Sequence, residues 1–323
     1  MSNTTASGGR TWGQFVEADA GVNLVDYAIS GATCSNDIIS RYFDSLGFTF
    51  PAVLGDEIPS FTADVAFKSL FPNRTADNTV YALWIGTNDL GIGAFLDDYQ
   101  TPGATISDFV GCLWDVFDAI YKTGGRRFVL FNQAPLEQTP LYATPEDGGA
   151  GDNQYWVDKT KANNVTESSQ KIREYSTSVN TMIEYGVPFH LVVKSRWPGA
   201  TFTIFNVHQL LQDIIKSPGD YLDAPADATG FYHHCKPTDN SDCTDSENSA
   251  SSFLWFDELH PSEKAGKFAA HARVTSREPL LTTSNFRFHN RQALLGCCCR
   301  ELHVRDSVRI IGGQENEPGG LPS

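Results

Sequence analysis

Long apolar runs, positive charge and methionine are scarce in this sequence of 323 residues. No stretch approaches the roughly 18 consecutive apolar residues of a membrane-spanning helix, so we expect no membrane span. Lysine and arginine number 24 against 39 aspartates and glutamates, which gives a formal net charge of −15. So acidic a chain does not attract phosphate backbones, and this excludes general binding to nucleic acid. Residues 1–10 are small and polar, so no signal peptide is visible there.

The cysteines and the glycosylation triplets favour an oxidising compartment. Cys235 and Cys243 flank a short polar loop, and we expect a disulfide between them. Asn-x-Ser/Thr triplets begin at Asn3, Asn73 and Asn164. We therefore expect an extracellular, secreted glycoprotein. A secreted chain without a visible signal peptide indicates that its N-terminal beginning is missing.

Apolar runs and helical repeats alternate along the chain, and 41% of the residues are hydrophobic, enough for a sizeable core. Short β-branched and aromatic runs, typical of buried parallel strands, occupy residues 24–29, 80–85, 127–132, 190–193 and 202–207. Helical spacing covers residues 106–122, 164–185, 207–215 and 262–271. This alternation predicts a three-layer α/β domain with a parallel sheet over residues 1–275.

Residues 276–323 differ from the rest of the chain. Residues 277–323 contain six arginines and five acidic residues, and three cysteines are adjacent at 297–299. Adjacent cysteines seldom converge on one metal ion, so we expect no metal site there. The periodicity of this segment is weak, apart from residues 307–311. We expect an irregular or disordered tail, of the kind that a faulty gene model produces.

The first motif with chemical capacity is Gly86-x-Asn88-Asp89, which follows a predicted strand. Glycine allows a sharp turn at the end of the strand, and an asparagine amide can donate a hydrogen bond to an oxyanion. The alternative is an ordinary turn in which Asn88 and Asp89 cap the next segment.

The second motif, Asp257-x-x-His260-Pro261, leads into a predicted helix. At this spacing Asp257 can accept a hydrogen bond from His260, fix its tautomer and stabilise its protonated form. The alternative is that Asp257 caps the helix and His260 is a surface residue. A third, weaker motif is the turn at Gly31, whose backbone N–H can point into the same crevice.

Taken in chain order, the turn at Gly31, the motif with Asn88 and the motif with His260 resemble the second, third and fifth blocks of the SGNH (GDSL-type) hydrolase family. The segment Ser7-Gly-Gly-Arg-Thr-Trp12 is similar to fungal acetylesterases of carbohydrate esterase family 16. The resemblance implies a flavodoxin-like sheet of strand order 2-1-3-4-5. It also implies that His260 is the general base, that Asp257 orients it, and that Gly31 and Asn88 form the oxyanion hole.

The family's first block, Gly-Asp-Ser, is absent. The Gly-Asp pairs at residues 55–56, 151–152 and 219–220 are not followed by serine, so the nucleophile is not present in this chain. Ser7, Ser30 and Ser35 are the serines nearest the second block, but a substitute must meet both the base and the oxyanion donors. The predicted strand at 24–29 matches the family's second strand. We therefore expect a chain that is truncated at its N-terminus, lacks the first, central strand, and is inactive or nearly so.

The leading hypothesis is a carboxylic ester hydrolase, acetylesterase-like, that acts on short acyl or carbohydrate esters without a cofactor or metal. Its partner would be a small acylated substrate, an acetylated carbohydrate foremost. The alternative is a non-catalytic protein of the same fold that binds glycans. A third hypothesis is a metal-dependent hydrolase that uses His233, His234, His260 and Asp257, although adjacent histidines point apart.

Overall fold

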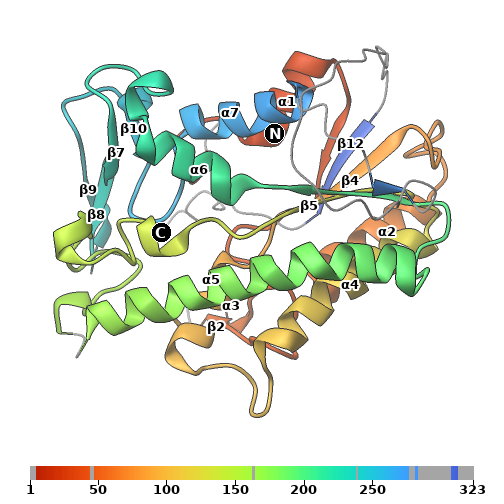
Figure 1. Cartoon of the computed structure of the whole chain (residues 1–323), viewed down its shortest axis with the longest axis horizontal. Helices are drawn as coiled ribbons and strands as arrows, with labels where there is room; N and C mark the ends of the chain where they lie inside the picture. The colour runs from red at the N-terminus through yellow and green to blue at the C-terminus, as the bar shows by residue number, and fades with distance from the viewer. Residues whose placement is uncertain are drawn as a thin grey trace, which may run out of the picture.

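A six-stranded sheet forms the centre of the molecule (Figure 1). The computed structural model describes residues 5–43, 47–161, 164–237, 239–275, 281–282 and 307–311. The sheet order is β1-β12-β4-β5-β6-β11, and only β11 runs antiparallel to its neighbour. The strands are β1 (Leu24–Asp26), β4 (Thr79–Leu83), β5 (Arg127–Phe131), β6 (Thr201–Phe205), β11 (Leu281–Thr282) and β12 (Ser307–Ile311).

Helices cover both faces of this sheet. Figure 1 shows α1, α6 and α7 on one face and α2, α4 and α5 on the other, which confirms the predicted α/β class. Their bounds are α1 (Trp12–Ala20), α2 (Ile58–Ala66), α4 (Ile106–Lys122), α5 (Val165–Pro188), α6 (Val207–Lys216) and α7 (Glu263–Thr275). A short helix, α3 (Thr87–Leu90), follows β4.

The described part of the chain also contains three two-stranded sheets and several single turns. The small sheets pair β10 with β7, β2 with β3 and β8 with β9. Their strands are β2 (Tyr42–Phe43), β3 (Phe48–Thr49), β7 (Asp227–Phe231), β8 (His233–Lys236), β9 (Asp239–Asp245) and β10 (Phe253–Trp255). The short helical turns are η1 (Val53–Glu57), η2 (Phe95–Asp97), η3 (Leu136–Gln138), η4 (Pro145–Asp147), η5 (Lys159–Lys161), η6 (Phe189–Val193), η7 (Pro218–Asp220) and η8 (Ala250–Ser252).

The second position of the sheet is held by β12, from the C-terminal part of the chain. β12 runs parallel to both neighbours, with Val308 opposite Leu24 and Ile311 opposite Leu83. From the sequence we expected this central position to lack its strand and residues 276–323 to be irregular. β12 coincides with residues 307–311, the part of that tail excepted from its weak periodicity, and it supplies backbone partners to β1 and β4. The remaining tail, including the three adjacent cysteines, lies outside the described residues apart from β11.

Helix α4 has the bounds that its sequence predicts. The Thr105 hydroxyl accepts a hydrogen bond from the N–H of Asp108, whose carboxylate accepts from the N–H of Thr105, so a capping box begins the helix. Its periodic apolar side chains are buried, and Phe117 lies 4.7 Å from Phe202 and 5.1 Å from Phe128 between ring centroids. This aromatic cluster fixes α4 against β5 and β6.

The predicted strand at residues 190–193 is wrong. These residues belong to η6, which continues the helical path of α5, and only Leu191 among them is buried. A short apolar run bears no periodicity that separates a buried strand from a buried helical turn, so the pattern alone was ambiguous.

The described residues contain two disulfides and no helix long and apolar enough to cross a membrane. The predicted Cys235–Cys243 bond is confirmed; it joins β8 to β9. The bond between Cys34 and Cys112 was not predicted. It connects the segment that follows β1 to α4, across 78 residues of sequence.

The two disulfides should contribute unequally to stability. In the chain-entropy view, the separation of 78 residues corresponds to about 4.5 kcal/mol and the separation of 8 residues to about 2.5 kcal/mol. We expect the double variant Cys34→Ala/Cys112→Ala to lose about 2 kcal/mol more unfolding free energy than Cys235→Ala/Cys243→Ala. Urea unfolding under non-reducing conditions measures both, and an equal or reversed loss would contradict this ranking.

Candidate active site

The turns after β1 and β4 meet at the carboxyl end of the sheet. Gly86 has a φ of 132°, and a Cβ there would lie 2.2 Å from the Gln133 side chain, so the turn after β4 needs glycine. This turn starts α3, which carries Asn88. The half-buried Asn88 amide donates to the carbonyl oxygen of Ala32 at 3.2 Å. Asn88 therefore lies against the turn that contains Gly31.

Gly31 is held on two sides. Its φ is 81°, and a Cβ would come within 2.9 Å of the Phe50 ring. The Arg41 guanidinium donates to the Gly31 carbonyl oxygen at 2.9 Å. The structure thus brings together the two residues for which the resemblance implies a role in the oxyanion hole.

Asp89 sits beneath these turns as a fully buried carboxylate. Its Oδ1 accepts the backbone N–H of Cys34 at 2.8 Å, and its Oδ2 is buried without a hydrogen-bond partner among the described residues. Burial raises the pKa of Asp89 to about 7, although the Cys34 N–H and the charge of Arg41 oppose the shift. Asp89 joins the turn after β4 to the disulfide-bonded segment after β1.

The loop between β10 and α7 holds the predicted acid–base pair. His260 Nδ1 lies 2.9 Å from Asp257 Oδ2, and Asp257 Oδ1 accepts the backbone N–H groups of Leu259 and His260 at 2.8 and 2.7 Å. Asp257 and His260 are only 2% and 9% exposed. Asp257 therefore accepts hydrogen bonds from the backbone of its own turn and also contacts the His260 ring. His260 is buried, so it is not the surface residue that the alternative interpretation of this motif expects.

Tyr155 is a third member of this group that the sequence analysis missed. Its hydroxyl donates to Asp257 Oδ2 at 2.7 Å and lies 3.4 Å from His260 Nδ1. Burial of Asp257 raises its pKa, but the His260 charge and hydrogen bonds from His260 and Tyr155 outweigh that effect and lower the pKa below 3.8. The carboxylate is thus ionised at neutral pH and able to stabilise a protonated His260.

A second polar cluster, around Glu258, lies next to the Asp257–His260 pair in the chain. Glu258 contacts Nδ1 of His234, and its backbone oxygen accepts the N–H of Leu141 at 2.7 Å. Burial raises the pKa of Glu258 and lowers the pKa of Lys159 to about 8. The buried Lys159 ammonium donates to the carbonyl oxygens of Pro140 and Ala143, both at 3.2 Å. These bonds join the Asp257–His260 loop to the loop that follows β5.

The histidines of the metal hypothesis are directed to different partners. His233 and His234 are successive residues of β8, whose side chains alternate between faces. His233 Nδ1 lies 2.6 Å from Asp245 Oδ1, whereas His234 contacts Glu258. Among the described residues, the one cluster with ligand spacing is His233 with Cys235 and Cys243, whose sulfurs form the disulfide. No described group joins these histidines to His260 as a ligand set.

A parallel α/β sheet with amide donors in its carboxyl-end turns, together with a buried histidine–aspartate pair, is the framework of an α/β ester hydrolase. Residues 2–272 match the family model described as "GDSL-like Lipase/Acylhydrolase", and the chain therefore belongs to this family. It is accordingly a carboxylic ester hydrolase of the GDSL type.

Three curated proteins illustrate the relationship. An acetylesterase of Hypocrea jecorina is 49% identical over 269 residues, which cover 83% of this chain and 76% of that protein. An acetylesterase of Thermothelomyces thermophilus is 25% identical over 279 residues, covering 83% of this chain and 74% of that protein. A GDSL esterase/lipase of Arabidopsis thaliana is 23% identical over 272 residues, which cover 78% of this chain and 62% of that protein.

Removal of the Tyr155 hydroxyl should weaken the stabilisation of the Asp257 carboxylate. We expect Tyr155→Phe to raise the Asp257 pKa, because the hydrogen bond to the ionised form is lost. A ¹³C NMR titration of the Asp257 carboxyl carbon measures the shift. Tyr185→Phe, on the exposed face of α5, is the matched control and should leave the titration unchanged. An unaltered Asp257 titration in Tyr155→Phe would show that the hydroxyl does not act on the carboxylate.

Asp89 should make stability fall as pH rises. Its folded-state pKa of about 7 lies above the ordinary 3.8, so its protonated form favours folding, and that contribution is lost between about pH 4 and pH 7. We expect Asp89→Asn, which keeps the acceptor for Cys34, to remove this decline, roughly 1.4 kcal/mol per pH unit at most. Urea unfolding at several pH values measures it, with exposed Asp37→Asn as the control. Parallel pH curves for wild type and Asp89→Asn would refute the assignment.

Proposed function

We propose that this protein is an esterase for short acyl groups, acetyl foremost, and that its natural substrates are acetylated carbohydrates. The observation that carries the proposal is the buried pair His260–Asp257, held at 2.9 Å in a chain 49% identical to an acetylesterase. Neither the pair nor the fold alone names a substrate, because one fold hosts many activities. The acetyl preference comes from the relatives, and the carbohydrate preference from the family resemblance.

The proposed mechanism is acyl transfer through a serine. His260 removes the proton of the nucleophilic hydroxyl through Nε2, because Nδ1 faces Asp257. Asp257 holds the tautomer and stabilises the imidazolium that forms. The N–H of Gly31 and an amide hydrogen of Asn88 then stabilise the oxyanion of the tetrahedral intermediate. This mechanism needs neither metal nor cofactor.

We further propose that the nucleophile is not supplied by the printed sequence. None of its Gly-Asp pairs precedes a serine, and the family's first strand would lie where β12 now pairs with β1 and β4. β12 is followed by Gly312-Gly313 rather than by a Gly-Asp-Ser turn. β12 thus completes the sheet without bringing the nucleophile, and the chain by itself should be inactive or nearly so.

The two disulfides and the Asn-x-Ser/Thr triplets support an extracellular, glycosylated protein. The non-catalytic alternative, a glycan-binding protein of the same fold, is favoured by one observation, the absence of a serine after any Gly-Asp pair. The two proposals differ in whether a chain that carries Gly-Asp-Ser hydrolyses esters.

The test compares the printed chain with a version that carries an N-terminal strand ending in Gly-Asp-Ser. We expect no turnover of 4-nitrophenyl acetate and no labelling by a fluorophosphonate probe for the former, and both for the latter. In the longer version, Asn88→Ala should lower kcat by about 10²–10³. Asp257→Asn should lower it by about 10⁴.

Tyr185→Phe, on the exposed surface of α5, should leave kcat unchanged in the same assay. A longer version that neither hydrolyses a short ester nor reacts with the probe would overturn the esterase proposal. It would then leave glycan binding as the better account.

A further inference from the structure

The hairpin of β8 and β9 brings four reactive side chains together on one of its faces. In the antiparallel pairing, His233 lies opposite Asp245 and Cys235 lies opposite Cys243. Side chains alternate along a strand, so His233 and Cys235, two residues apart, point to the same side of β8. An imidazole and a carboxylate therefore lie beside the Cys235–Cys243 disulfide. The proposed ester hydrolysis uses none of these side chains.

His233 lies between a carboxylate and a sulfur. Its Nδ1 is 2.6 Å from Asp245 Oδ1, and its Nε2 is 3.1 Å from the Sγ of Cys235. The other carboxylate oxygen of Asp245 accepts the Tyr232 hydroxyl at 3.2 Å. Both ring nitrogens of His233 thus face acceptors, an arrangement that the doubly protonated imidazolium satisfies at both ends. Asp245 also determines which nitrogen faces the sulfur.

The position of the His233 ring is also fixed by Phe256. The two rings stack, with centroids 5.2 Å apart and planes inclined by 13°, and the His233 N–H donates to the Phe256 carbonyl oxygen at 2.6 Å. An aromatic face stabilises a cation placed over it. The charged residues next to the two cysteines in the chain, Lys236 and Asp242, contact each other. His233 is therefore the group held in place to carry a proton beside Cys235.

The two cysteines of this disulfide differ in what surrounds them. Cys235 is 3% exposed and contacts the imidazole, whereas Cys243 is partly exposed. A thiolate that attacks a disulfide bonds to one sulfur and expels the other, and a better stabilised thiolate is expelled faster. A histidine cation beside a cysteine stabilises its thiolate. The surroundings thus favour attack at Cys243 and departure of Cys235.

We propose that the Cys235–Cys243 disulfide is a site of thiol–disulfide exchange with small thiol compounds, and that His233 and Asp245 promote the exchange. The small thiol reacts as its thiolate, after releasing its proton to solvent. Its sulfur bonds to Sγ of Cys243 while the S–S bond breaks, and the electron pair of that bond stays on Cys235 as a thiolate paired with protonated His233.

The outcome depends on the number of thiol groups in the small molecule. A monothiol gives a mixed disulfide on Cys243. In a dithiol, the second sulfur attacks that mixed disulfide and expels Cys243, so the dithiol is oxidised to its own disulfide and both cysteines are reduced. The exchange goes beyond the proposed esterase function, because it involves no ester and no serine.

The test follows the reaction of the folded full chain with dithiothreitol at pH 7. Thiols already present are first alkylated with iodoacetamide, and newly formed thiols are then labelled with N-ethylmaleimide and mapped by mass spectrometry. We expect labelling of Cys235 and Cys243, while Cys34 and Cys112, which are 0% and 3% exposed, stay joined. With glutathione in place of dithiothreitol, an acid-quenched sample should carry the mixed disulfide on Cys243.

Variants separate the effect of His233 from that of exposure alone. His233→Asn should slow reduction by dithiothreitol about tenfold, because the departing thiolate loses a charge-assisted hydrogen bond. Asp245→Asn should slow it severalfold, because the imidazolium loses its carboxylate partner. Thr244→Ala is the matched control, since Thr244 lies opposite His234 and so belongs to the other face of the hairpin, and it should react as wild type does.

A second measurement keeps the test decisive if His233→Asn loosens the hairpin. In Cys243→Ser the remaining Cys235 thiol should form a thiolate–imidazolium pair, whose ultraviolet thiolate absorbance at pH 7 should exceed that of Cys243→Ser/His233→Asn. The proposal is overturned if His233→Asn neither slows reduction nor lowers this absorbance, if Thr244→Ala slows reduction as much as His233→Asn, or if glutathione attaches to Cys235. None of these outcomes depends on ester hydrolysis, so a failed esterase proposal leaves the result standing.

Discussion

The arrangement of the candidate active site depends on one buried carboxylate, that of Asp257. Burial alone would drive it to the neutral form, yet four donors surround it: two backbone N–H groups of its own turn, His260 Nδ1 and the Tyr155 hydroxyl. Because these donors stabilise the ionised form, the carboxylate stays charged where water cannot solvate it. The same hydrogen bonds fix the turn, the histidine tautomer and the ring position. The Asp257 carboxylate therefore fixes both the local backbone conformation and the acid–base partner of His260.

The sheet obeys a comparable constraint. A parallel strand in the interior must have both edges paired, because its N–H and C=O groups have no water to bond. β1 and β4 would each have an open edge without a strand between them. β12, a segment from the other end of the chain in which three of five residues are β-branched, pairs with both edges. β12 therefore sets the spacing of β1 and β4, and beyond the ends of these strands the turns that carry Gly31 and Asn88 meet through the hydrogen bond from Asn88 to Ala32.

The sequence predicted correctly those features that depend on residues close together in the chain. The bounds of α4 were correct because its capping box and its apolar spacing lie within the helix itself. Asp257 and His260 are three residues apart, so their contact was also visible in the sequence. Tyr155 lies 102 residues from Asp257, and nothing in its neighbours distinguishes it from other tyrosines. The Cys34–Cys112 bond, the helical form of residues 190–193 and the position of β12 likewise depend on packing between distant segments.

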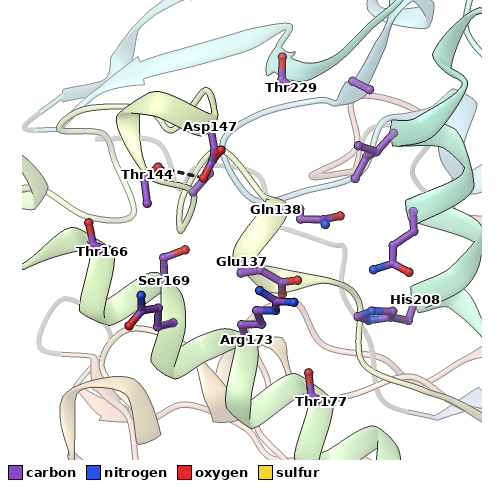
Figure 2. A pocket seen from close by; sticks show the side chains of 15 residues that line it. Glu137, Gln138, Thr144, Asp147, Thr166, Ser169, Arg173, Thr177, His208 and Thr229 are labelled. Carbon is purple, nitrogen blue, oxygen red and sulfur yellow. Dashed lines mark hydrogen bonds between the residues drawn. The ribbon is translucent and has the colours of Figure 1, made fainter.

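A polar recess lined by Glu137, Arg173 and His208, among others (Figure 2), shares structural supports with the candidate active site. The loop that contributes Glu137 to the recess also donates the Leu141 N–H to Glu258, which is adjacent to Asp257. On the other side, His208 lies 3.2 Å from the Gln133 carbonyl oxygen, and the Gln133 side chain packs against Gly86 at the turn before Asn88. Residues that line the recess are thus one contact away from both the acid–base pair and the turn that carries Asn88, so the same loops shape the recess and position both halves of the candidate site.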